Sequence, residues 1–234
     1  MRNTTSKLLY SILYPTLFVL LLWAIKLFEI VEKVNFTYYG LYPRSISGLQ
    51  GIITAPLIHG SVDHLIANSV PLLILGPIIY FFYRPIAFQI FFWVYFITGL
   101  WVWVGGRHVI HIGASGIIYG FETFLFFSGV FRKDPRLLSL SLFVVFIYGS
   151  TIWGIFPLQR GISFESHFLG ALAGLITAYH FRKEGPPNRK YDFGDEAENE
   201  KIDVSGNDEI PPQIIDNEPD QTVIHYNYIP KEKE

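Results

Sequence analysis

Six long apolar stretches, separated by polar segments, constrain this sequence more than any other feature does. A helix needs about 20 mainly apolar residues to cross the hydrocarbon core of a membrane. The six candidate spans are Leu8–Ile30, Leu65–Tyr83, Pro85–Val104, Ile112–Phe131, Leu137–Phe156 and the shorter Ser166–Phe181. The sequence therefore predicts an all-α, polytopic membrane protein built as a bundle of six transmembrane helices.

The composition excludes several other classes of protein. Half of the residues are hydrophobic and only 16% are charged, against about 25% in soluble domains, so an ordinary cytosolic globule is excluded. The chain has no cysteine, which excludes a disulfide framework, a thiolate metal site and a cysteine nucleophile. Its net charge of −2 provides no basic field for nucleic acid, and we expect no nucleic-acid partner.

Charge divides the chain into two parts near residue 183. Of the 20 acidic residues 14 follow this position, but only 5 of the 18 basic residues do. We therefore expect a membrane domain over residues 1–183 and an acidic tail over residues 184–234. The tail holds too few apolar residues to offset the entropy lost on ordering, so we expect it to be mostly disordered. Its sequence does not identify a partner.

The distribution of basic residues predicts which side of the membrane each loop occupies. If both termini are cytoplasmic, the inner segments hold ten Lys and Arg residues and the outer loops hold four, as the positive-inside rule requires. The first span lacks a clear small-residue cleavage site and five spans follow it, so we interpret it as retained rather than as a signal peptide. This plan suits a bacterial plasma membrane. It leaves a long outer loop at Val31–Asp63, and loops of such length often carry function.

Three polar clusters lie at the outer ends of different spans in this plan. His64 and Asn68 are four residues apart, on one face of the second span. Ser115, preceded by Gly113, opens the fourth span, and His167 opens the sixth. Polar groups at membrane depth cost free energy and usually mark a function or a packing need. We therefore expect the three clusters to converge at one depth, near water but within the bundle.

Glycines beside these clusters predict that the fourth and sixth spans pack closely. Each span carries two glycines four residues apart, namely Gly116 and Gly120 in the fourth, and Gly170 and Gly174 in the sixth. Such small faces allow two helix backbones to approach each other. This packing would bring Ser115 within hydrogen-bond reach of His167. Tyr119 lies one turn below Ser115, where its ring could support the imidazole by stacking.

These residue types fit nucleophilic catalysis. A serine hydroxyl is a weak nucleophile until a base removes its proton, and a neighbouring histidine can act as that base. A developing oxyanion needs hydrogen-bond donors, for which Asn68, His64 and the Ser115 N–H are the candidates. A flanking glycine such as Gly113 would let a substrate backbone approach closely. The alternative is structural, with Ser115 bonded to its own helix and with His64 and Asn68 paired between spans.

The three clusters together resemble the motifs of the rhomboid family of intramembrane serine proteases. The resemblance covers about Ser47–Phe181 and includes the order of the motifs, the six spans and the long first loop. It implies that Ser115 is the nucleophile and that His167 is the general base. The other implied site residues are His64, Asn68 and Gly113 at the oxyanion and binding site, with Tyr119, Gly116, Gly170 and Gly174 in support.

The resemblance also implies the kind of substrate. Rhomboids cleave transmembrane segments of other membrane proteins, usually after a small residue, so we expect such partners within the lipid bilayer and no metal or cofactor. One alternative is a non-catalytic rhomboid-like protein that binds client transmembrane helices, against which the intact Ser115 and His167 argue. A more distant alternative is a small transporter coupled through Glu122, which is disfavoured because the sequence shows no inverted repeat.

Several features of the sequence leave alternatives open. Many rhomboids carry a Trp-Arg pair in the first outer loop, but residues 49–51 are Leu, Gln and Gly here, so the resemblance does not identify what braces the loop. Glu122 is expected to have a structural role, or else to help hydrate the site. His59 is expected to brace the loop. A metal site formed by His59, His108 and His111 is disfavoured because no carboxylate or thiolate accompanies them.

Overall fold

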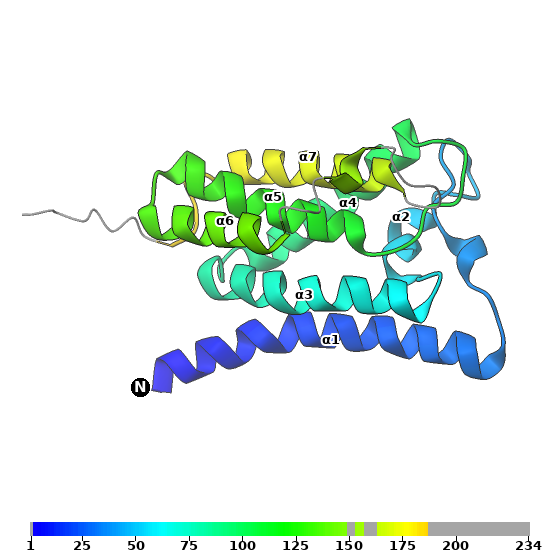
Figure 1. Ribbon diagram of the computed structural model, residues 1–234, viewed down its shortest axis with the longest axis horizontal. Coiled ribbons are helices and arrows are strands. Elements are labelled where there is room, and N and C mark those ends of the chain that lie inside the picture. The colour runs from blue at the N-terminus through cyan, green and yellow to red at the C-terminus, as the bar shows by residue number, and fades with distance from the viewer. Residues whose placement is uncertain (1, 149–152, 157–162, 187–234) are drawn as a thin grey trace, which may run out of the picture. The chain divides into compact units, whose positions relative to one another are not determined.

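The computed structural model describes residues 2–148, 153–156 and 163–186, and the named elements within these ranges are helices joined by loops. A helix overlaps each of the six predicted spans (Figure 1), although α6 covers only the first part of the fifth. They are α1 (Arg2–Glu32), α3 (Val62–Phe82), α4 (Ala87–Gly105), α5 (Ser115–Arg132), α6 (Pro135–Tyr148) and α7 (Phe164–His180). The short helices η1 (Thr37–Tyr39), α2 (Gly51–Thr54) and η2 (Ala55–Leu57) lie in the predicted outer loop. The all-α prediction is confirmed for the described residues.

Three of these helices have the length and apolar character of a membrane span. They are α1 over Lys7–Glu32, the whole of α3 and the whole of α4. The described α6 and α7 are shorter, at 14 and 17 residues. The predicted fifth span includes residues 149–152, which lie outside the described ranges, as does the predicted tail beyond residue 186. The chain is thus an integral membrane protein, while the full count of six spans stays a prediction.

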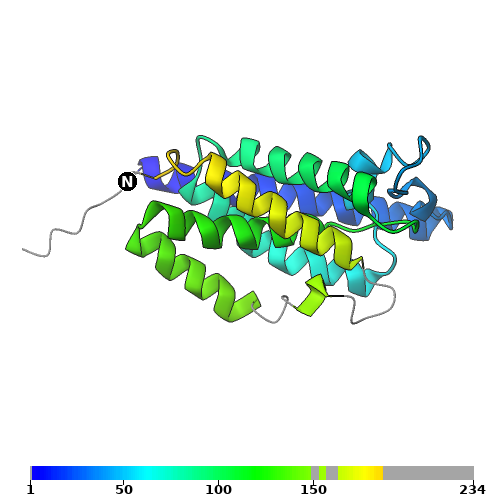
Figure 2. The same cartoon turned by 90° about the horizontal axis from the view of Figure 1, so that it is seen from above.

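Helix α5 is the element around which the others pack. It contacts α3, α4, α6 and α7, whereas α1 lies along α3 (Figure 1). Helix α7, yellow in Figure 2, runs beside both α4 and α5. All of these helices belong to one structural unit, Met1–Lys190. The arrangement brings the beginnings of α5 and α7, which carry two of the predicted polar clusters, to the same end of the bundle.

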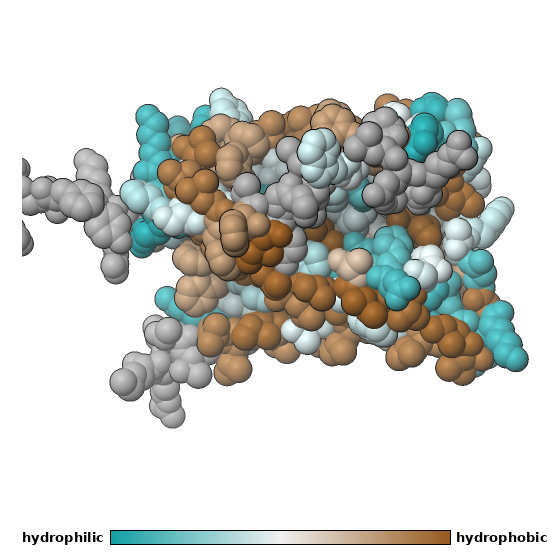
Figure 3. Space-filling model, viewed as in Figure 1, coloured by the Kyte–Doolittle hydropathy of each residue, from teal (hydrophilic) through white to brown (hydrophobic). Residues whose placement is uncertain are grey.

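The apolar side chains of the helices face two different environments. One set is fully buried and forms the core; it includes Leu22, Leu65, Leu75, Ile90 and Phe124. Another set is exposed along the outward face of α1 and includes Leu9, Leu17, Leu20, Leu21 and Phe28. Figure 3 shows hydrophobic side chains along this edge. Apolar patches of this extent are rare on soluble proteins, and lipid is the environment that suits them.

Glycines set the distance between α5 and α7. A Cβ atom added at Gly170 would overlap the carbonyl oxygen of Gly116, and one added at Gly174 would overlap the carbonyl oxygen of Gly120. Overlap with a backbone atom cannot be relieved by rotating a side chain, so this approach requires glycine. The predicted close packing of the fourth and sixth spans is therefore confirmed.

The outer loop is braced by its own backbone and by a tryptophan from α4. Trp103 Nε1 donates a hydrogen bond to the Ser45 carbonyl oxygen at 2.9 Å. Leu41 pairs with His111 through two backbone hydrogen bonds of 2.9 and 2.8 Å. Gly51 packs directly on this segment, because a Cβ atom added there would overlap the backbone of Leu41. Residues 49–51 lie where many rhomboids carry the Trp-Arg pair. A long side chain at Gly51 would therefore not fit in this structure.

We predict that Gly174→Ala destabilises the protein, whereas Gly105→Ala does not. The added methyl group at Gly174 must push α7 away from the Gly120 carbonyl, and overpacking of this kind costs about 1–3 kcal/mol. Gly105 ends α4, and a Cβ atom added there meets nothing within 4 Å. Thermal unfolding of both variants in mild detergent measures the difference. Equal midpoints for the two variants would show that the helices can separate at no cost.

Candidate active site

The predicted clusters of α5 and α7 meet where these two helices begin. Ser115 is the first residue of α5, and His167 lies in the first turn of α7. The Ser115 Oγ atom is 2.8 Å from His167 Nε2, which is hydrogen-bond distance. Gly154, in the segment before α7, places its carbonyl oxygen 2.9 Å from His167 Nδ1. The imidazole therefore has a polar partner at each of its nitrogens.

Tyr119 provides a flat surface for the imidazole. The ring centroids of Tyr119 and His167 are 4.3 Å apart, and the ring planes differ by 11°, so the two rings stack as predicted. Since Tyr119 follows Ser115 by one turn, α5 supplies both the hydroxyl and the stacking surface. The stacking and the two hydrogen bonds together fix the orientation of the buried His167 ring.

The partners of His167 determine which nitrogen carries the proton. A carbonyl oxygen can only accept a hydrogen bond, so the Gly154 carbonyl requires a proton on Nδ1. In the neutral ring, Nε2 is then an acceptor, and the Ser115 hydroxyl donates to it. In this arrangement an imidazole can remove the proton of a serine hydroxyl.

His64 and Asn68 approach the same region from α3. Gly113, two residues before Ser115, has a φ of +103°, which favours glycine. A Cβ atom added at Gly113 would lie 2.7–2.8 Å from the His64 ring and 3.8 Å from Asn68 Nδ2. Asn68 is buried, and its Nδ2 donates to the His64 carbonyl oxygen at 3.0 Å. All three predicted clusters thus come together around the start of α5.

The start of α5 leaves backbone donors available. Ala114 precedes the helix and provides no side-chain cap. The first N–H groups of a helix have no partner within the helix, and that of Ser115 is one of them. These groups carry the positive end of the helix dipole. The arrangement suits an anionic oxygen beside Ser115.

His59 lies in the outer loop just before α3, outside the spans, and its ring packs on that of His64. The two rings form a T-shaped pair with centroids 5.0 Å apart, and His59 is 1% exposed. Burial lowers the pKa of His59 to about 4, and the nearby His64 ring adds to this shift, while the Leu57 backbone opposes it. The His59 ring is therefore neutral at pH 7. The predicted brace of the loop comes from its backbone, because the His59 carbonyl oxygen accepts from Lys26 Nζ at 2.9 Å.

The three histidines considered for a metal site have separate surroundings. His108 accepts a hydrogen bond from Arg44 Nε at 3.3 Å, and His111 Nδ1 lies 2.6 Å from Ser163 Oγ. His59 packs on His64, as described above. Within the described ranges no three potential ligands gather as a metal would require.

A second polar network was not predicted. Arg107 Nη2 donates to Glu165 Oε2 at 3.0 Å, which ties the segment before α5 to the first turn of α7. Beside this pair, Ser163 Oγ lies between His111 Nδ1 at 2.6 Å and Ser166 Oγ at 2.7 Å. Burial is the main cause that lowers the pKa of His111. Arg107 and Glu165 are 58 residues apart and His111 and Ser163 are 52 residues apart, and no spacing rule in the sequence connects either pair.

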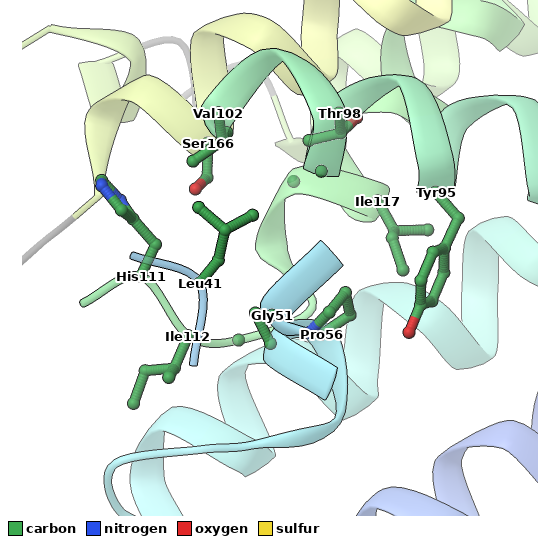
Figure 4. Close-up of a pocket in the computed structure, with 14 residues that line it drawn as sticks. Leu41, Gly51, Pro56, Tyr95, Thr98, Val102, His111, Ile112, Ile117 and Ser166 are labelled. Atoms are coloured by element: carbon green, nitrogen blue, oxygen red, sulfur yellow. The ribbon is translucent and has the colours of Figure 1, made fainter. Parts of the chain in front are cut away.

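A pocket of about 380 Å³, counting the part open to the outside, lies beside the start of α5 (Figure 4). Its walls are mostly apolar and include Leu41, Pro56, Val102 and Ile117. Thr98, His111 and Ser166 add polar groups, and the buried Thr98 Oγ1 has no hydrogen-bond partner among the residues that the structure describes. Because Gly113 and Gly116 flank Ser115 and line this pocket, it adjoins the serine.

Comparison with known families agrees with this geometry. The model of the Rhomboid domain matches residues 47–184, which is more than half of the chain. The chain belongs to the rhomboid family. The resemblance seen in the motifs is therefore confirmed, over nearly the same residues.

Relatives of this rhomboid occur in mycobacteria. An uncharacterized protein of Mycobacterium tuberculosis is 34% identical over 175 residues, which cover 69% of this chain and 71% of that protein. A protein of Mycobacterium bovis matches to the same extent, and one of Mycobacterium leprae is 30% identical over 175 residues, or 68% of its length. All three are named as uncharacterized, so the argument for an activity rests on the family and on the geometry of the site.

Glu122 of this rhomboid lies in α5, seven residues after Ser115, and is partly buried. Seven residues are about two helical turns, so the carboxyl group lies deeper in the bundle on nearly the same face. Its role, in the structure or in hydrating the site, stays a prediction.

We predict that Gly154→Ala disturbs the position of the proton on His167. The added Cβ atom would overlap the Tyr119 hydroxyl and lie 3.0 Å from His167 Nδ1, so the carbonyl oxygen must move. Nitrogen-15 NMR of the histidine rings in micelles, assigned with a His167→Gln variant, should show a protonated Nδ1 in the wild type. The Gly154→Ala protein should show a mixture of tautomers.

A second substitution distinguishes this effect from general disruption. Tyr119→Phe removes the hydroxyl that the new methyl group would strike. The Gly154→Ala, Tyr119→Phe protein should therefore recover most of the Nδ1-protonated form seen in Tyr119→Phe alone. An unchanged tautomer in Gly154→Ala would contradict the role of the carbonyl.

Proposed function

We propose that this rhomboid is an intramembrane serine protease that hydrolyses peptide bonds in or near transmembrane segments of other membrane proteins. The observation that carries the proposal is the 2.8 Å contact between Ser115 Oγ and His167 Nε2, with Nδ1 held by the Gly154 carbonyl. A serine with a purely structural role usually bonds to its own helix, as Ser139 does with the Pro135 carbonyl. Ser115 faces an oriented imidazole instead.

In the proposed reaction, Ser115 and His167 act as a dyad. Ser115 Oγ attacks the scissile carbonyl carbon while His167 Nε2 takes the hydroxyl proton. The tetrahedral intermediate collapses, the C–N bond breaks, and His167 gives the proton to the leaving amine. Water from the outer side then attacks the resulting ester as His167 removes its proton, and return of that proton to Ser115 releases the carboxyl product. The Gly154 carbonyl and the Tyr119 ring perform the orienting role that a carboxylate has in a triad.

The donors for the oxyanion come from two helices. The Ser115 N–H lies at the uncapped start of α5, and Asn68 and His64 reach toward Gly113 from α3. An asparagine amide carries two protons, and Asn68 uses one of them on the His64 carbonyl, which leaves the other for the substrate. Donors that are fixed before the reaction stabilise an oxyanion without further reorganisation.

The proposal includes the placement of the protein in the membrane. We infer six spans with both termini cytoplasmic, in a bacterial plasma membrane, so that Ser115 lies toward the outer surface. The substrate would enter between α3 and α6, both of which pack against α5, and would unwind beside Ser115. The small pocket that adjoins the serine suits a small substrate side chain next to the scissile bond.

A fluorophosphonate probe should label the wild-type protein in detergent, because such probes react with a serine that a base activates. We predict that Ser115→Ala and His167→Ala abolish the labelling and the cleavage of a transmembrane substrate. Ser139→Ala is the matched control and should label like the wild type, since its hydroxyl bonds only to its own helix in the described structure. Turnover retained in pure Ser115→Ala would refute the assignment. A folded wild type that binds transmembrane helices but neither labels nor cleaves would support the client-binding alternative.

We predict that Asn68→Ala lowers the rate of cleavage by up to roughly 10²–10³-fold, the loss seen when a main oxyanion donor is removed. The substrate concentration at half-maximal rate should change little, because the donor acts on the transition state. Steady-state kinetics with a transmembrane substrate measures both quantities. A rate equal to that of the wild type, with a lower unfolding temperature, would assign Asn68 a structural role.

A further inference from the structure

An aromatic groove runs between α1, α3 and α4, and Phe121 of α5 also lines it. Tyr14 and Phe18 of α1 form one wall, and Phe88, Phe91 and Phe92 of α4 form the other. The groove encloses about 560 Å³, counting its open side. The two walls touch through ring edges, with centroid distances of 4.8 Å for Tyr14 and Phe88 and 5.3 Å for Phe18 and Phe91.

The groove continues along α4 toward the outer loop. A second hollow of about 490 Å³ shares Phe18, Phe91 and Phe92 with the first, and it extends to Ile53 and Phe96. From Phe88 to Phe96 the helix rises by about 12 Å at 1.5 Å per residue. The two hollows together therefore form an elongated apolar channel parallel to the helices, which is the shape of a hydrocarbon chain rather than of a globular partner.

One end of this groove carries a cation. Arg84 lies in the short turn between α3 and α4, and its guanidinium carbon is 5.6 Å from the centroid of the Tyr10 ring. Tyr10 in turn stacks on Tyr14 at 6.5 Å, so the aromatic wall of the groove leads directly to the guanidinium. The cation thus lies near the Tyr14 end of the groove, over the face of an aromatic ring.

The surroundings of Arg84 differ from those of the other arginines near the membrane surface. Arg107 is paired with Glu165, and Arg136 with Asp134. Arg84 is exposed and makes no hydrogen bond or ion pair with any residue in the described ranges. Among the described residues, its guanidinium donors are therefore available to an anion.

We propose that this groove binds one anionic phospholipid, with an acyl chain along the α4 aromatic rings and the phosphate on Arg84. The apolar channel fits the chain, and the exposed guanidinium, which has no ionic partner among the described residues, fits the phosphate, for which arginine has complementary geometry. Basic residues at a membrane surface attract anionic lipids in this way. Neither Ser115 nor His167 lines the groove, so the proposal does not depend on catalysis.

Native mass spectrometry of the delipidated full-length protein tests the head group. The three ligands to compare are phosphatidylglycerol, phosphatidylcholine with the same acyl chains, and glycerol phosphate, which represents the head group alone. The wild type should bind phosphatidylglycerol about fivefold better than phosphatidylcholine, as expected from one added cation–anion contact. Glycerol phosphate should not bind detectably. Equal binding of the two lipids, or binding of glycerol phosphate alone, would overturn the proposal.

Two variants locate the contact. Arg84→Gln should remove the preference for phosphatidylglycerol while keeping the binding of either lipid by its chain. Lys133→Gln is the matched control, because Lys133 is an exposed cation at the turn between α5 and α6 and lies outside the groove. The proposal would be overturned if the two variants preferred phosphatidylglycerol to the same degree. It would also be overturned if the delipidated protein formed dimers and bound no lipid.

Photocrosslinking locates the chain. Phosphatidylglycerol with a diazirine in its acyl chain should label α1 and α4 peptides that contain Phe18, Phe91 and Phe92. Labelling spread evenly over the outward faces of all helices would mean that the lipid is only bulk solvent for the protein, and would overturn the proposal.

Discussion

The contact between α5 and α7 sets the position of the other parts of the site. Backbone meets backbone at Gly116 with Gly170 and at Gly120 with Gly174. Ser115 precedes the first of these glycines directly, and His167 lies one turn before Gly170. Since successive residues of a helix are rotated by about 100°, a shift of one residue between the helices would turn Ser115 away from the imidazole. The glycine pairs therefore fix the register in which the hydroxyl and the ring meet.

Main-chain groups perform tasks in this protein that side chains often perform elsewhere. The Gly154 carbonyl orients His167, the paired backbones of Leu41 and His111 hold the outer loop, and Gly51 packs where a large side chain would not fit. A peptide dipole costs less free energy to bury than an ion does. For a site within a membrane protein, the use of dipoles in place of ions limits that cost.

The helices and the convergence of the polar clusters could be predicted from the sequence, because both depend on local properties of the chain. Apolar length predicts a span, and two glycines four residues apart predict a close helix contact. The carbonyl of Gly154 could not be predicted in the same way, because every residue has a carbonyl and only the path of the chain selects one of them. The pairing of Arg107 with Glu165 escaped prediction because it joins a loop to the first turn of α7, 58 residues further along the chain.

The neutral carbonyl at Gly154 also determines the charge balance of the proposed reaction. With neutral His167 and Ser115, the site starts uncharged. In the tetrahedral intermediate the imidazolium and the oxyanion cancel, so the sum is again zero, whereas a triad with a carboxylate would carry one negative charge at both stages. A transmembrane voltage does work on net charge that moves or appears within its field. In a dyad completed by a peptide oxygen, the reaction therefore creates only a short dipole and no net charge. Its rate can then be almost independent of the transmembrane voltage.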